Sequence, residues 1–200
     1  MYRGQGQRPV ARTRPFFLLA VALTLSGFAS FAVVIGLVPL MHARGADATT
    51  AAWALGLGGA GQTLGRTLYA ALARRTSVTT RTMALITAGA ATTALLGLVP
   101  GPIPFLVVLA VLAGVVRGNL TLLQATAVAD RWGTGQYGRL SALLAAPVTV
   151  ATSLVPFTGA ALAGPLGGYP ALFLLLAALS LTAALLSLGT NTPRPSAESV

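Results

Sequence analysis

Cysteine and lysine are absent from this 200-residue chain, and acids and histidine are scarce. Without cysteine there can be no disulfide framework, no iron–sulfur cluster and no cysteine metal site. Three acids (Asp47, Asp130 and Glu198) and a single histidine, His42, leave little material for a catalytic or metal-binding set. We therefore expect no enzyme activity, no bound metal and no cofactor.

Charge of either sign is also missing from long stretches. Charged residues make up 8% of the chain and hydrophobic residues 55%, whereas about 25% of a soluble domain is charged. Three stretches without any formal charge are bounded by Arg14 and Arg44, by Arg81 and Arg117, and by Arg139 and Arg194. A helix of about 20 apolar residues crosses a bilayer core. The sequence therefore predicts an all-α polytopic membrane protein.

Six transmembrane helices are predicted, between a basic arm at residues 1–14 and a polar tail at residues 190–200. The first apolar run is longer than the 7–15 residues or so of a signal peptide, so we expect a retained helix there. Prolines at 100, 102 and 104 separate the third span from the fourth, and Pro147 and Pro156 predict kinks in the fifth. The predicted spans are 15–41, 49–73, 82–98, 103–129, 140–162 and 169–188.

The arginines predict the orientation of these spans. If six helices alternate, the opposite side of the membrane holds Arg44 alone, and ten arginines share the other side: Arg3, Arg8, Arg12, Arg14, Arg74, Arg75, Arg81, Arg131, Arg139 and Arg194. Arginine-rich loops stay in the cytoplasm. We therefore expect both termini to be cytoplasmic, in a multi-pass protein of the plasma (inner) membrane.

The net charge of +10 does not indicate a nucleic-acid-binding protein. The arginines lie at the ends of apolar spans, whereas a nucleic-acid site gathers them on one face. The use of arginine without lysine, beside abundant alanine and glycine, is typical of a GC-rich bacterial genome. The expected environment is therefore the lipid bilayer.

Two stripes run along the second span. Gly58, Gly61 and Gly65 form a smooth side that a neighbouring helix can approach closely. Beside it, Gln62, Arg66 and Tyr69 recur at helical spacing and form a polar stripe. Polar groups face lipid only at a cost, so we expect this stripe to face the bundle interior or a water-filled cavity.

The fourth span repeats the arrangement with Gly114, Arg117, Thr121 and Gln124. A guanidinium at mid-membrane costs about 2.5–3.5 kcal/mol on insertion scales, so Arg117 needs a compensating partner. No acid occurs within any predicted span. Either Arg117 braces backbone carbonyls of neighbouring helices, or it lines a transport cavity.

A second cluster is expected at the cytoplasmic ends of the second and fourth spans. Asp130 and Arg131 follow the fourth span, and Arg74 and Arg75 follow the second, with Arg81 close by. An ion pair from Asp130 to Arg74 or Arg75 would either neutralise a helix end or act as a cytoplasmic gate. An exposed pair contributes about 0–1 kcal/mol, so we expect Asp130→Asn to leave abundance intact.

These segments resemble one half of a major facilitator superfamily (MFS) transporter. The run from Gly61 to Arg75 occupies the place of the family's Gly-x-Leu-Ala-Asp-Arg-x-Gly-Arg-Arg signature, in which Leu72, Ala73 and Arg75 fit. It departs from that signature at three positions. Ala70 stands for the first Gly, Arg74 for the Asp and Ser77 for the second Gly. Residues 118–140 are similar to a family helix four or ten, and residues 137–169 to helices eleven and twelve.

The resemblance implies a bundle with cytoplasmic termini that pairs with a second six-helix half. It most favours the C-terminal half, as a fragment of a longer transporter, a split or self-pairing half, or an inactive gene remnant. The implied function is alternating-access transport of a small solute, anionic or amphipathic, with efflux as one direction. The implied cavity comprises Gln62, Arg66, Tyr69, Arg117, Thr121 and Gln124. The alternative is a membrane scaffold or assembly subunit whose polar stripes lock helices together.

Overall fold

The computed structural model describes residues 10–190, and all the regular structure in that range is helical. The arm at residues 1–9 and the tail at 191–200 lie outside the described residues. The elements are η1 (Val10–Arg12), α1 (Arg14–Ala43), α2 (Ala48–Arg75), α3 (Val78–Leu98), α4 (Ile103–Thr126), α5 (Ala129–Trp132), α6 (Tyr137–Ser153), α7 (Val155–Ala163) and α8 (Tyr169–Leu188). This composition confirms the predicted all-α class.

Local signals explain where the helices begin and end. Asp47 caps α2 by accepting a hydrogen bond from the Thr50 amide, and Ser77 caps α3 by accepting one from the Thr80 amide. The proline-rich segment between α3 and α4 cannot continue a helix. Gly167 and Gly168, with φ of 88° and 119°, make the turn between α7 and α8, a conformation that suits glycine.

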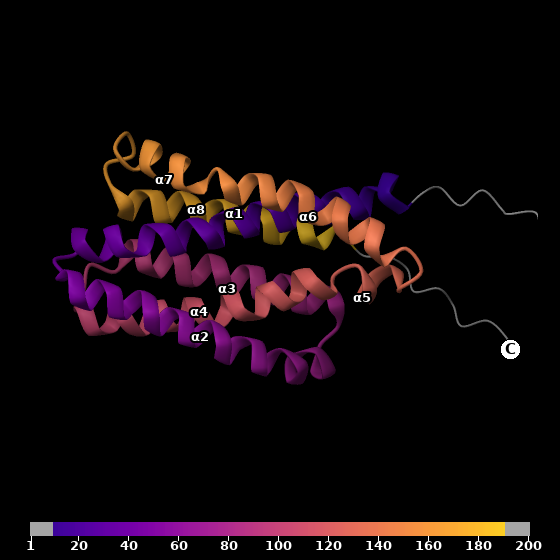
Figure 1. Ribbon diagram of the computed structural model, residues 1–200, viewed down its shortest axis with the longest axis horizontal. Helices are drawn as coiled ribbons and strands as arrows, with labels where there is room; N and C mark the ends of the chain where they lie inside the picture. Colours follow the sequence, from indigo (N-terminus) through magenta and orange to yellow (C-terminus); the bar gives the residue numbers. More distant parts are fainter. Residues whose placement is uncertain (1–9, 191–200) are drawn as a thin grey trace, which may run out of the picture.

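The long helices lie side by side along one axis (Figure 1). In that view, the start of α1, the α2–α3 turn, α5 and the end of α8 all lie at the right-hand end of the bundle, here named the α5 end. The α1–α2, α3–α4 and α7–α8 connections lie at the opposite end. Helix α2 packs along α4, α3 packs along α8, and α1 contacts α8 and α6.

Four helices are long and apolar enough to cross a membrane, namely α1, α3, α4 and α8, and α6 with α7 forms a fifth span if that bent pair is counted as one. These spans confirm a polytopic membrane protein. Helix α2 is less apolar, because glycines, threonines, Gln62 and Arg66 lower its hydropathy. Its 28 residues reach about 42 Å at 1.5 Å per residue, so a sixth crossing stays a prediction.

Three predicted spans differ from the observed helices. The third begins at Val78, four residues earlier than predicted. The fifth is broken at Leu154, where α6 and α7 meet at 43°, just before Pro156. The fourth ends at Thr126, three residues early, and the short α5 follows it. Arg117 therefore lies nine residues from the α5 end of α4 and fourteen from the other end.

Glycines bring α2 and α4 into backbone contact, as the smooth side of the second span predicted. A Cβ added to Gly61 would lie 2.5 Å from the Val111 carbonyl oxygen. A Cβ on Gly65 would overlap the Val115 carbonyl, and one on Gly118 would overlap the Gln62 carbonyl. These glycines therefore fix how closely α2 lies against α4.

Candidate functional site

A pocket of about 300 Å³ lies between α1, α4 and α6. Its apolar lining residues are Leu23, Ala125, Leu144, Ala145 and Val148. Its polar lining residues are Thr121, Gln124, Tyr137, Ser141 and Thr149. A volume of this size is at the lower end of the range for small-molecule sites.

Three polar groups in this pocket have no hydrogen-bond partner within residues 10–190: the Gln124 amide and the hydroxyls of Ser141 and Thr149. The Ser141 oxygen is buried. By contrast, the Thr121 hydroxyl donates to the Arg117 carbonyl at 2.8 Å, and the Tyr137 hydroxyl donates to the Ala125 carbonyl at 3.0 Å. The lining of the pocket therefore combines free hydrogen-bond donors and acceptors with apolar side chains.

Arg117 lies in a different place from the pocket. Its side chain lines a small recess between α1, α3 and α4, with Ser30, Thr92 and Thr93 among the lining residues. The guanidinium makes no hydrogen bond within the described part of the chain. The recess has hydroxyl groups but no acid, so the structure gives Arg117 polar surroundings and leaves its charge unpaired there.

The predicted stripe on α2 divides into three environments. Tyr69 is buried, Gln62 is half-buried and Arg66 is exposed. Arg66 therefore does not point into the interior of this chain's own bundle, and its place in a water-filled cavity stays a prediction. The outward position of Arg66 follows from Gly65, which contacts the α4 backbone so closely that the next side chain emerges on the outer flank of α2.

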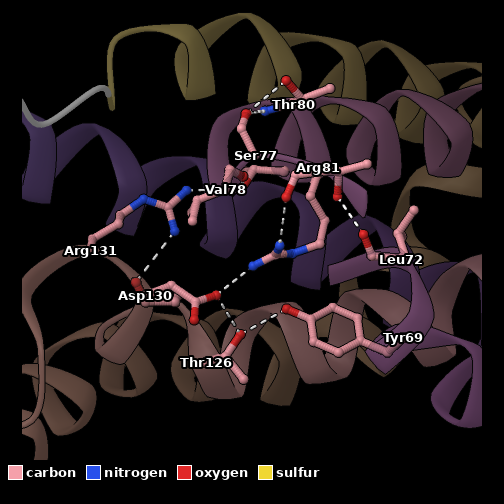
Figure 2. Close-up of polar contacts among 12 residues, drawn as sticks. Tyr69, Leu72, Ser77, Val78, Thr80, Arg81, Thr126, Asp130 and Arg131 are labelled. Carbon is pink, nitrogen blue, oxygen red and sulfur yellow. Dashed lines mark hydrogen bonds and ion pairs between the residues drawn. The ribbon is translucent and has the colours of Figure 1, made fainter. Parts of the chain in front are cut away.

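At the α5 end, a polar network joins α2, α3, α4 and α5 (Figure 2). The Arg81 guanidinium donates to Asp130 Oδ2 at 2.6 Å, and Thr126 Oγ1 donates to the same oxygen at 3.0 Å. Because the Thr126 proton is used there, the Tyr69 hydroxyl donates to Thr126 Oγ1, at 2.7 Å. Arg81 also lies 5.4 Å from the centre of the Tyr69 ring, within cation–π distance.

Arg131 adds a second positive charge to this network. It donates to Thr82 Oγ1 at 2.8 Å and to the Ala127 carbonyl at 3.3 Å. Burial lowers the pKa of Arg131 to about 10, a shift that Asp130 opposes and Arg81 reinforces. Arg131 therefore stays charged at neutral pH and ties the start of α3 to α5.

The acid of this network pairs with a different arginine from the ones expected. Arg74 and Arg75 are exposed at the end of α2, and Asp130 binds Arg81 in the first turn of α3. The Arg81 side chain is 4% exposed and that of Asp130 is 28% exposed. The expectation of a weak, exposed ion pair was therefore wrong, because the arginine of the pair is buried. The sequence prediction missed Ser77 as the N-cap of α3. Because the helix begins directly after Ser77, Arg81 lies in its first turn and is buried.

Among residues 10–190, no group of three histidines, cysteines or acids is arranged to hold a metal ion. The described residues form a polar pocket, a recess beside Arg117 and a polar network at one end of a helical bundle.

The sequence model of the Major Facilitator Superfamily matches residues 17–200, which is most of the chain. The chain belongs to the major facilitator superfamily. No curated protein matches it at a significant level. Members of this superfamily are transporters rather than enzymes, so the chain is a multi-pass membrane protein of a transporter family. The resemblance that the motifs carried is thereby confirmed.

Within the superfamily fold, the signature-like run from Gly61 to Arg75 forms the second half of α2. The structure brings two predicted cavity residues together, Thr121 and Gln124, which share the pocket. It places Gln62, Arg66, Tyr69 and Arg117 elsewhere. Sequence reasoning missed Tyr137, Ser141 and Thr149, which come from α6. The available signal was their spacing, since steps of four and eight residues keep side chains near one face of a helix.

Proposed function

We propose that this chain forms part of a secondary transporter that moves a small solute across the plasma membrane by alternating access. The observation that carries the proposal is the pocket between α1, α4 and α6, with three unpartnered polar groups in a bundle of membrane-spanning helices. Unpaired polar groups at membrane depth are costly unless they serve a substrate or an ion. Family membership supports the same reading.

In this proposal α2 forms the sixth span and the α5 end faces the cytoplasm. The described part of that end carries Arg12, Arg14, Arg74, Arg75, Arg81, Arg131 and Arg139, whereas Arg44 lies at the other end. This asymmetry supports a cytoplasmic α5 end, in a bacterial inner membrane.

A second six-helix unit completes the path, either on the same polypeptide or on another one. Transporters of this type hold the substrate between two such units. The exposed side of α2, including Arg66, supports this arrangement, since an arginine on a membrane helix needs a polar neighbour. Arg74 and Arg75 are exposed at the same end and are available to the second unit.

The network around Asp130 serves as the gate at the α5 end in this scheme. Asp130, Arg81 and Arg131 connect α3 to α5, and Tyr69 connects α2 to them through Thr126. Movement of α4 and α5 relative to α2 and α3 would have to break these bonds. The network therefore favours the state in which the α5 end is closed.

The test is flux in proteoliposomes that contain the chain with its second unit. A panel of neutral, anionic and cationic solutes is measured with the unmodified protein, with Ala145→Phe, and with Leu181→Phe. Ala145 lines the pocket, and Leu181 is exposed on α8, away from it. We expect Ala145→Phe to stop flux and Leu181→Phe to preserve it. Flux that does not depend on the protein, for every solute, would overturn the proposal and favour the scaffold alternative. Flux that Ala145→Phe leaves intact would exclude this pocket from the transport path.

A further inference from the structure

The lining of the pocket limits the charge of a ligand that this chain can bind there. Among the described residues, no Arg, Asp, Glu or His lines it. The arginine nearest in sequence on α4 is Arg117, and its side chain lines the separate recess against α1 and α3. The arginines expected to make a positive cavity are therefore not part of its wall.

An ion would find little compensation inside this pocket. Moving a carboxylate or an ammonium out of water is costly unless an opposite charge receives it. The Gln124 amide and the hydroxyls of Ser141 and Thr149 are neutral donors and acceptors. They match the hydroxyl, amide or carbonyl groups of an uncharged molecule.

The ligand must also have an apolar side. Leu23, Leu144 and Val148 also line the pocket, so a purely polar ligand would leave these side chains without favourable contacts. The volume of about 300 Å³ is at the lower end of the range for small-molecule sites. These features favour a compact molecule with one polar end and one apolar end.

We propose that the pocket between α1, α4 and α6 binds a small, uncharged, amphipathic molecule, with its polar end on the buried, unpartnered hydroxyl of Ser141. This inference rests on the proposed function, since it names the substrate class of the same pocket. It replaces the anionic substrate that a cavity lined by Arg66 and Arg117 would favour.

Three probes of one shape separate the charge classes: benzamide is neutral, benzoate is an anion and benzamidinium is a cation. Their binding to the purified full chain in detergent is measured by ligand-observed NMR. The control is Ala145→Phe, in which the larger side chain fills the pocket. Any probe signal that remains in this variant comes from partition into the micelle. We expect benzamide to bind at least about tenfold more tightly than either ion, and we expect this binding to disappear in Ala145→Phe.

Ser141→Ala tests the polar end. The Ser141 oxygen is buried without a partner, so its removal should leave the melting temperature of the ligand-free protein unchanged or higher. The same change should weaken benzamide binding about two- to tenfold, the effect of one neutral hydrogen bond. The matched control is Ser153→Ala, which lies on the same helix and donates to the Thr149 carbonyl.

Tighter binding of benzoate or benzamidinium than of benzamide, lost in Ala145→Phe, would overturn the substrate class. Equal signals from all three probes in the unmodified chain and in Ala145→Phe would overturn the pocket as a binding site. Failure of the proposed function gives a different result from either of these. In that case benzamide still binds in the pocket, but solute flux in proteoliposomes does not depend on the protein.

Discussion

Removal of the Asp130 charge should destabilise the bundle. In Asp130→Asn the shape of the side chain is kept, but the Arg81 guanidinium, 4% exposed, loses its negative partner. Its remaining contacts are the Thr76 carbonyl at 3.4 Å and the face of Tyr69. Breaking a fully buried ion pair costs about 3–5 kcal/mol, and a charged hydrogen bond alone about 1.5–3 kcal/mol. Because Asp130 is 28% exposed, we expect about 1–3 kcal/mol.

Thermal unfolding of the purified chain in detergent measures this loss. For a domain of 150–250 residues, each kcal/mol shifts Tm by about 2–4 °C, so the expected fall is about 2–12 °C. The matched control is Arg75→Gln, since Arg75 is exposed at the end of α2. This control should leave Tm within about 2 °C of the unmodified chain, as surface changes usually do.

A double-mutant cycle assigns the loss to the Arg81–Asp130 pair. Arg81→Met combined with Asp130→Asn removes both charges, so no unpaired guanidinium stays buried. The double variant should therefore be more stable than the sum of the two single losses predicts. Additivity within about 0.5 kcal/mol would refute the reasoning, because independent sites behave in that way. An equal fall in Arg75→Gln would refute it too.

Three further predictions follow from the fold. Gly118→Ala should lower stability by about 1–3 kcal/mol, because its Cβ would overlap the backbone of α2, while Gly56→Ala, with open space around it, should be neutral or stabilising in the same melts. The Thr50 amide lowers the pKa of Asp47 below 3.8, so the stability that Asp47 contributes is present above that value and lost as pH falls through the lowered pKa. The Tm difference between Asp47→Ala and the unmodified chain should therefore shrink between pH 6 and about pH 3, and an undiminished difference would contradict this sign. Reporter fusions at Val200 and within residues 45–50 should report opposite compartments, and identical compartments would disprove the proposed topology.

Much of the fold was predictable because its signals are local. Long runs without charge gave α1 and α8, and the proline-rich segment after Leu98 separated α3 from α4. The glycines at 58, 61 and 65 indicated a smooth packing side, and the structure confirms their backbone contact with α4. The identity of the partner helix depends on how whole helices pack, which no local pattern records.

The site was less predictable because it depends on which face of each helix is covered. Helical spacing placed Arg66 and Tyr69 on one stripe, but the contact at Gly65 turned Arg66 outward and left Tyr69 buried. Charge alone favoured Arg74 and Arg75 as partners of Asp130. Only the packed position of Arg81 in the first turn of α3 decided between them.

Labelling of single cysteines tests the transport path most directly. The chain has no native cysteine, so Thr121→Cys in the pocket reports without background when a membrane-impermeant maleimide is added to one side of the membrane at a time. Alternating access predicts that Thr121→Cys reacts from both sides, whereas Leu181→Cys, exposed on α8, reacts from neither. Protection of Thr121→Cys from both sides, to the same extent as Leu181→Cys, would contradict the account.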